Sequence, residues 1–152
     1  MKIPDLTDAL AAAKENRIHK WVISFLIASG NNLALADTLE QSGQYLYGPI
    51  DYPLKKLVNL IGPDDSFKYQ EDVAELQARV NNIVRDIHKG WQPPPLIATN
   101  LWEDYLELAD GGHRYMAFQS LGVDEYPTIF YFRDESTMDD FIRTLPKMLS
   151  KP

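Results

Sequence analysis

The chain has 152 residues, of which 45% are hydrophobic and 24% are charged. This length suits one domain with a sizeable core, and the composition is that of a globular rather than a disordered protein. The formal net charge of −7 argues against broad nucleic-acid binding, which depends on Lys and Arg neutralising phosphates. The absence of cysteine excludes disulfides, thiolate metal ligands and cysteine nucleophiles.

No segment has the features of a membrane span or a secretory signal. The best apolar run, Trp21–Ala28, is far shorter than the roughly 20 residues that a spanning helix requires. The first ten residues lack the basic-then-apolar order of a signal peptide. We therefore expect a cytoplasmic protein without membrane contact.

The N-terminal third is predicted to be helical. Thr7 can cap a helix that continues to Gly30, and residues 31–43 favour a second, shorter helix. The pair could be mistaken for a helix-turn-helix, but the acidic charge favours two packed helices and makes DNA binding unexpected. We take residues 1–50 as a helical extension packed on a domain formed by residues 51–152.

The next segment combines a short strand, a proline-limited turn and a loop. Tyr45, Tyr47 and Tyr52 are expected at the seam between the extension and the domain. Gly62–Asp65, with the sequence Gly-Pro-Asp-Asp, is typical of a turn.

A helix with one apolar stripe follows, with Gln70 or Asp72 near its start and Gly90 as its C-terminal stop. The stripe repeats at steps of three and four residues: Val73, Leu76, Val80, Ile83, Val84 and Ile87.

The second half of the chain alternates between strands and helices. Leu96–Thr99 and Tyr105–Leu108 are expected to pair as a hairpin, and Thr128–Phe132 suits a buried strand. Helices are predicted over residues 113–121 and 138–149. We therefore predict one α+β domain with a helical N-terminal extension.

The sequence Asp-Gly-Gly-His-Arg, residues 110–114, spans the predicted start of the helix over residues 113–121. A helix start has unpaired N–H groups and a partial positive charge, and Gly111 and Gly112 would let an anion approach the backbone. Arg114 offers donors that suit phosphate, while His113 can donate a hydrogen bond or carry a proton. Asp110 could cap the helix, hold His113 or meet a metal bound to the phosphates. Together these groups would form a phosphate-binding site.

The alternative is a tight strand-to-helix turn without a ligand. In that interpretation Asp110 caps the helix, while His113 and Arg114 are solvated. Few basic groups are expected near the motif, namely Lys89, Arg114 and Arg133.

The stretch ELADGGHRYMAFQSLGVDEYPTIFY resembles the signature of the ParB/sulfiredoxin-like superfamily. There an apolar strand leads into a Gly-x-His-Arg turn, an alanine-bearing helix, a Leu-Gly end and a strand that begins with proline. The resemblance covers roughly residues 53–132. The matching positions are Asp110, Gly111, Gly112, His113, Arg114, Ala117, Leu121, Gly122 and Pro127.

The resemblance implies a small mixed sheet with packed helices and a nucleotide whose phosphates bind at Gly111, Gly112, His113 and Arg114. The nucleotide would be ATP, ADP or CTP, with Mg²⁺ as a possible companion. Sulfiredoxin chemistry is excluded because this chain has no cysteine. Only about 20 residues follow Phe132, so a ParB-like DNA-reading region after the domain is not expected. The turn is most similar to that of the free-serine kinase branch.

In that kinase branch, a carboxylate upstream of the long helix activates the acceptor hydroxyl. Glu71 is our choice for this role and Asp72 the runner-up, the alternative being simple first-turn helix charges. Tyr69, Trp91 and Tyr115 could contact a base or a partner, although such residues more often pack at a core edge.

The main hypothesis is a phosphotransferase or nucleotide hydrolase that acts on a small substrate. Asp110, His113 and Glu71 would be its catalytic residues, and no set of protein metal ligands is predicted. The alternative is a non-catalytic interaction module or DNA-associated regulator, in which the N-terminal helices dock a protein partner.

Overall fold

The computed structural model describes residues 4–30, 32–42, 45–100 and 105–149, and the helix end predicted at Gly43 lies outside them. Within these ranges, no helix is both long and apolar enough to cross a bilayer. The helices are α1 (Leu6–Lys14), α2 (Ile18–Ala28), α3 (Leu33–Ser42), α4 (Val73–His88), α5 (Gly112–Ser120) and α6 (Glu135–Leu149), with a 3₁₀ turn η1 (Leu54–Lys56). The strands are β1 (Leu46–Pro53), β2 (Ile61–Gly62), β3 (Tyr69–Gln70), β4 (Leu96–Thr99), β5 (Glu107–Asp110) and β6 (Glu125–Tyr131).

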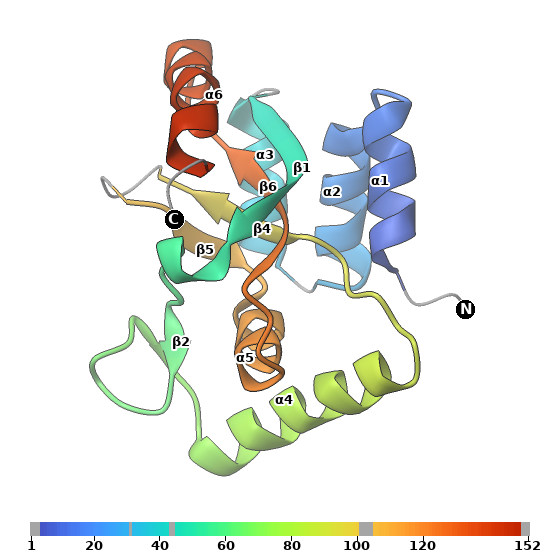
Figure 1. Cartoon of the computed structure of the whole chain (residues 1–152), viewed down its shortest axis with the longest axis vertical. Helices are drawn as coiled ribbons and strands as arrows, with labels where there is room; N and C mark the ends of the chain where they lie inside the picture. Colours follow the sequence, from blue (N-terminus) through green and yellow to red (C-terminus); the bar gives the residue numbers. More distant parts are fainter. Residues whose placement is uncertain (1–3, 31, 43–44, 101–104, 150–152) are drawn as a thin grey trace.

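Four of the strands form a mixed sheet in the order β1-β6-β4-β5 (Figure 1). β4 is parallel to β6, whereas β1 is antiparallel to β6 and β5 is antiparallel to β4. The short strands β2 and β3 pair separately. The predicted α+β class is therefore confirmed. The predicted hairpin also forms, but its second strand is Glu107–Asp110 and not Tyr105–Leu108.

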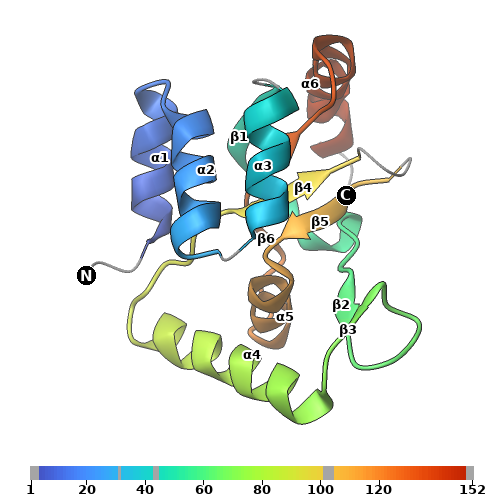
Figure 2. The ribbon, with the colours of Figure 1, turned by 180° about the vertical axis from the view of Figure 1, so that it is seen from behind.

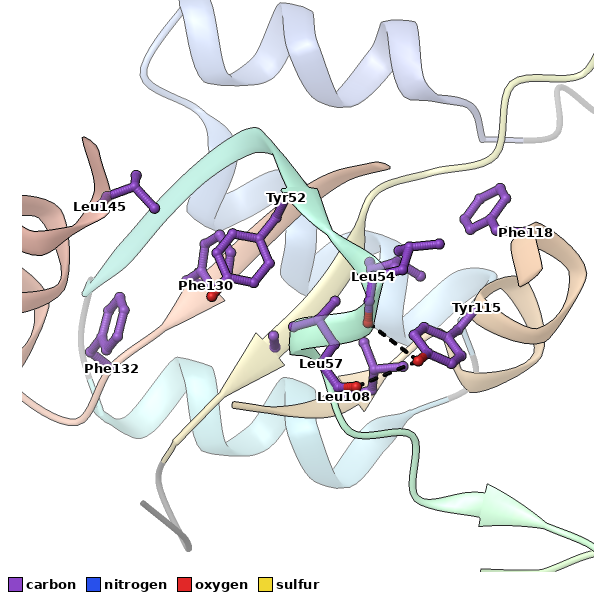
Figure 3. Packing of buried hydrophobic residues seen from close by; sticks show 11 residues of the cluster. Tyr52, Leu54, Leu57, Leu108, Tyr115, Phe118, Phe130, Phe132 and Leu145 are labelled. Atoms are coloured by element: carbon purple, nitrogen blue, oxygen red, sulfur yellow. Dashed lines mark hydrogen bonds between the residues drawn. The ribbon is translucent and has the colours of Figure 1, made fainter. Parts of the chain in front are cut away.

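Helices cover both faces of the sheet, so its central strands are buried on both sides. Ile97 of β4 and Ile129 of β6 pack with α2 and α3, which lie side by side in Figure 2. The neighbouring residues Ala98 and Phe130 point to the other face, where they pack with side chains of α5 and α6. This alternation explains why both strands are nearly continuous apolar runs. Figure 3 shows the cluster of buried residues on this second face, in which Tyr115 lies close to η1.

The N-terminal helix predicted between Thr7 and Gly30 is in fact two helices. Asp5, not Thr7, is the N-cap of α1, and its side chain accepts a hydrogen bond from the Asp8 amide. The chain turns at Asn16, which has a φ of 59°. Asn tolerates this left-handed conformation better than most residues, so a helix break fits this position.

The segment predicted as a short strand and turn is the eight-residue edge strand β1. Pro49 and Pro53 are compatible with it because an edge strand needs fewer N–H donors than a central one. β1 crosses the boundary expected after residue 50. Tyr47 and Tyr52 contact the ring of Phe141 in α6, with centroids 6.4 and 6.3 Å apart. Tyr45, Tyr47 and Tyr52 therefore pack with the cluster on the α6 side of the sheet and not with the cluster formed by α2 and α3.

The helix predicted over residues 73–87 is confirmed as α4. Its N-cap is Asp72 rather than Gln70, and the Asp72 side chain accepts hydrogen bonds from two first-turn amides. Leu76 and Val80 of the stripe are buried. Gly90, with a φ of 101°, follows the helix end as predicted. α4 packs against α5 and so brings the chain before α4 close to the Gly-Gly turn (Figure 1).

Candidate functional site

The centre of the candidate site is the turn between β5 and α5. β5 ends at Asp110, Gly111 is the N-cap with a φ of 104°, and α5 begins at Gly112. A Cβ on Gly111 would lie 2.8 Å from Leu96 Cδ2, so both conformation and space require glycine here. No side chain caps α5, and the expected capping role of Asp110 is therefore wrong. The first amides of α5 have no partner within the helix and remain the positive end of its dipole.

Gly112 permits a close approach of β2 and of the residues just before it. A Cβ at this position would lie 2.7 Å from Ile61 Cδ1 and 2.8 Å from Asn59 Oδ1. The backbone of Gly112 is in the helix and does not need a positive φ. The two glycines therefore have different roles: Gly111 makes the turn and Gly112 leaves room for its neighbours.

His113 and Glu71 form a pair at the start of α5. Nε2 of His113 lies 2.8 Å from Oε1 of Glu71, and the two side chains are 21% and 26% exposed. Glu71 is held in place because its N–H donates to the carbonyl of Gly62, next to the β2–β3 pair. Asp72, the other carboxylate considered for this position, caps α4 instead.

Arg114 is largely buried and is part of the internal structure. Its side chain is 12% exposed, and Nη2 donates to the carbonyl of Pro95 at 2.9 Å and lies 3.4 Å from Oδ2 of Asp110. The guanidinium carbon lies 5.5 Å from the ring centroid of Phe25 in α2. Asp110 also accepts a hydrogen bond from Asn32, just before α3, at 3.2 Å. The expectation of a solvated Arg114 is therefore wrong, since Arg114 and Asp110 join the turn to the N-terminal helices.

A cavity of about 580 Å³ opens beside the start of α5. Its cationic side chains are Lys68, next to β3, and Arg79, on α4, whereas the basic residues expected from sequence, Lys89 and Arg133, do not line it. The wall contributed by the N-terminal helices includes Asn32 and Thr38. Lys68 and Arg79 were missed because a one-dimensional pattern shows which face of α4 is apolar but not what lies opposite its polar face. Gly111, Gly112 and His113 line the cavity at the turn.

A second cavity of about 270 Å³ lies against the same turn. It shares Gly30, Asp110, Gly111 and His113 with the larger one, and Arg114 belongs to this smaller cavity only. Its remaining lining is largely apolar and comes from several elements: Pro4, Phe25, Ser29, Ile83, Trp91 and Pro94.

The three aromatic residues considered as contacts for a base or partner have different environments. Tyr69 is 53% exposed and lines the larger cavity. Trp91 lines the smaller cavity, and its Nε1 donates to the carbonyl of Pro4 at 3.1 Å. Tyr115 is buried and donates to the carbonyl of Leu54 at 3.2 Å (Figure 3), so it is a core residue rather than a contact residue.

Metal-binding groups do not converge in the part of the chain that the structure describes. No group of three or more His, Asp or Glu side chains there could hold a metal ion.

Similarity to known proteins is found at the level of solved structures. No protein-family model matches the chain. No curated protein matches it either. Among solved structures, the chain is similar to the C-terminally truncated chromosome-partitioning protein ParB from Caulobacter crescentus, complexed with CTP-γ-S. The identity is 13% and the TM-score 0.39, with 68% of this chain and 54% of that chain covered, so this chain spans about half of the ParB chain. At these values the similarity assigns neither a ligand nor a site residue.

Proposed function

We propose that this protein binds a nucleotide, ATP, ADP or CTP, with its phosphates at the start of α5. The observation that carries the proposal is the larger cavity, in which the uncapped helix start of Gly111 and Gly112 faces the same space as Lys68 and Arg79. Anions bind at helix starts because the amides point outward and the dipole is positive there. The volume of about 580 Å³ lies within the range of small-molecule sites.

Each residue of the motif has a distinct role in this proposal. The amides of Gly112 and His113 donate to phosphate oxygens, and Lys68 and Arg79 offset the remaining negative charge. Arg114 and Asp110 act as positioning residues, because their contacts with Pro95 and Asn32 hold the turn in place. Mg²⁺, where present, would bind mainly through the phosphates.

Phosphoryl transfer to a small acceptor, or to water, is the second part of the proposal. It is supported by the His113–Glu71 pair, whose closest atoms are 2.8 Å apart at the edge of the phosphate site. The acceptor oxygen would bond to the terminal phosphorus while the bond from that phosphorus to the bridging oxygen breaks, and the nucleotide leaves with one phosphate fewer. The acceptor proton would pass to the second oxygen of Glu71, whose first oxygen is held by His113.

Isothermal titration with ATP, ADP and CTP, each with and without Mg²⁺, tests nucleotide binding. Arg79→Gln should weaken binding about tenfold, because it removes a charged contact worth roughly 1.5 kcal/mol. Arg85→Gln is the matched control, since Arg85 is exposed on the same helix and does not line the cavity. The absence of binding by all three nucleotides would overturn the proposal.

Phosphate release and transfer to hydroxyl compounds test the catalytic part. Glu71→Gln should lower turnover by 10²- to 10⁴-fold, the usual contribution of a general base, while nucleotide affinity changes little. Nucleotide binding without any turnover would instead favour the non-catalytic interaction module.

A further inference from the structure

We infer that the nucleobase occupies the smaller cavity and that the phosphate chain crosses the start of α5 into the larger one. This orientation rests on the proposed nucleotide binding. It accounts for two cavities that meet at Gly30, Asp110, Gly111 and His113.

The two cavities differ in the chemistry of their walls as the two ends of a nucleotide do. The larger one contains Lys68 and Arg79 as well as Glu107 and Asp110, and its two cations and the start of α5 suit the phosphates. The smaller one is walled by Phe25, Ile83 and Trp91, together with two prolines, and suits a planar, largely apolar ring system. Gly30 and Gly111 contribute no side chain to the shared edge, whereas Asp110 and His113 contribute polar ones.

The smaller cavity has the size and rigidity that a base requires. A void of about 150 Å³ is enough for a benzene ring, and about 270 Å³ is present here. Trp91 is fixed by its hydrogen bond to the Pro4 carbonyl. Phe25 stacks on Trp21 at 5.3 Å and lies against Arg114. A ring can therefore enter without reordering these side chains, which lowers the entropic cost of binding.

The orientation makes the N-terminal helices part of the ligand site. Phe25 lies in α2, and Ser29 and Gly30 follow its end, so this helix forms one wall of the base pocket. The Ser29 hydroxyl can donate to or accept from the edge of a base. Selection among bases would thus depend on the helical layer, and phosphate affinity on the α4–α5 side.

A matched pair of serine substitutions on α2 and its end tests the orientation. Ser29→Trp fills the smaller cavity, whereas Ser24→Trp places the same ring at an exposed position of α2 outside it. Titrations would use ATP, CTP and inorganic tripolyphosphate as probes. Ser29→Trp should weaken the better-binding nucleotide at least tenfold and leave tripolyphosphate unchanged, while Ser24→Trp changes neither. Arg79→Gln should weaken all three probes.

A second variant covers the opposite wall, and melting curves confirm that each variant folds. Ile83→Trp on α4 should reproduce the selective loss of nucleotide affinity. Equal weakening of nucleotide and tripolyphosphate by Ser29→Trp, or no weakening of either, would overturn the orientation while nucleotide binding itself stands. Failure of all three probes to bind the unmodified protein would overturn the proposed function as well.

Discussion

Replacement of Arg114 by alanine should destabilise the fold, contrary to what a surface position would suggest. The substitution removes a 2.9 Å hydrogen bond to the Pro95 carbonyl and the contact with Phe25, and it leaves Asp110 only 11% exposed without its cation. Removing one partner of a buried ion pair typically costs about 3–5 kcal/mol. Asp110 keeps its hydrogen bond from Asn32, so we expect a loss near the lower end, about 3 kcal/mol.

For a chain of this length, about 3 kcal/mol corresponds to a fall in Tm of roughly 6–12 °C. Circular dichroism melts and urea unfolding of Arg114→Ala measure it. Arg143→Ala is the control, because Arg143 pairs with Asp140 at the surface and its side chain is 72% exposed, so its effect should stay below about 0.5 kcal/mol. A change in Arg114→Ala no larger than that of the control would refute the bracing role and return Arg114 to the direct phosphate ligand considered from sequence.

Three further predictions follow from single positions. Gly112→Ala should lower the free energy of unfolding by about 1–3 kcal/mol, because its Cβ would lie 2.8 Å from Asn59 Oδ1; an unchanged urea midpoint would contradict this overpacking. Hydrogen bonds from the Thr137 backbone and side chain lower the pKa of Asp134 below its usual 3.8, so this carboxylate stabilises the fold above that pH and the contribution is lost as pH falls through the native pKa. The stability difference between wild type and Asp134→Ala should accordingly shrink from pH 6 to about pH 2, and a constant difference would exclude the linkage. Burial raises the pKa of Tyr126 above its usual 10.0, so the folded state keeps the proton longer and stability should fall as pH rises above 10; Tyr126→Phe should reduce this slope in alkaline unfolding measurements.

Local features of the sequence were sufficient for the elements with strong patterns. The apolar stripe predicted α4, and the paired apolar runs predicted the β4–β5 hairpin, because these periods directly report which face is buried. The start of α5 after the Gly-Gly turn was predicted within one residue of its observed position at Gly112. A helix break that depends on a single residue was harder to predict from the sequence, as the turn at Asn16 between α1 and α2 shows.

Contacts between distant segments were decided only by the tertiary structure. β1 became a strand because β6, some 80 residues later, offers it a partner, and isolated strand propensity does not report such a partner. The sequence suggested Glu71 as a functional carboxylate through resemblance alone, whereas its 2.8 Å contact with His113 results from the packing of α4 on α5 and the β2–β3 pair. The burial of Arg114 likewise depends on where α2 places Phe25. A residue type and its neighbours in sequence define what chemistry a side chain can perform, but its exposure and partners depend on elements that only folding brings beside it.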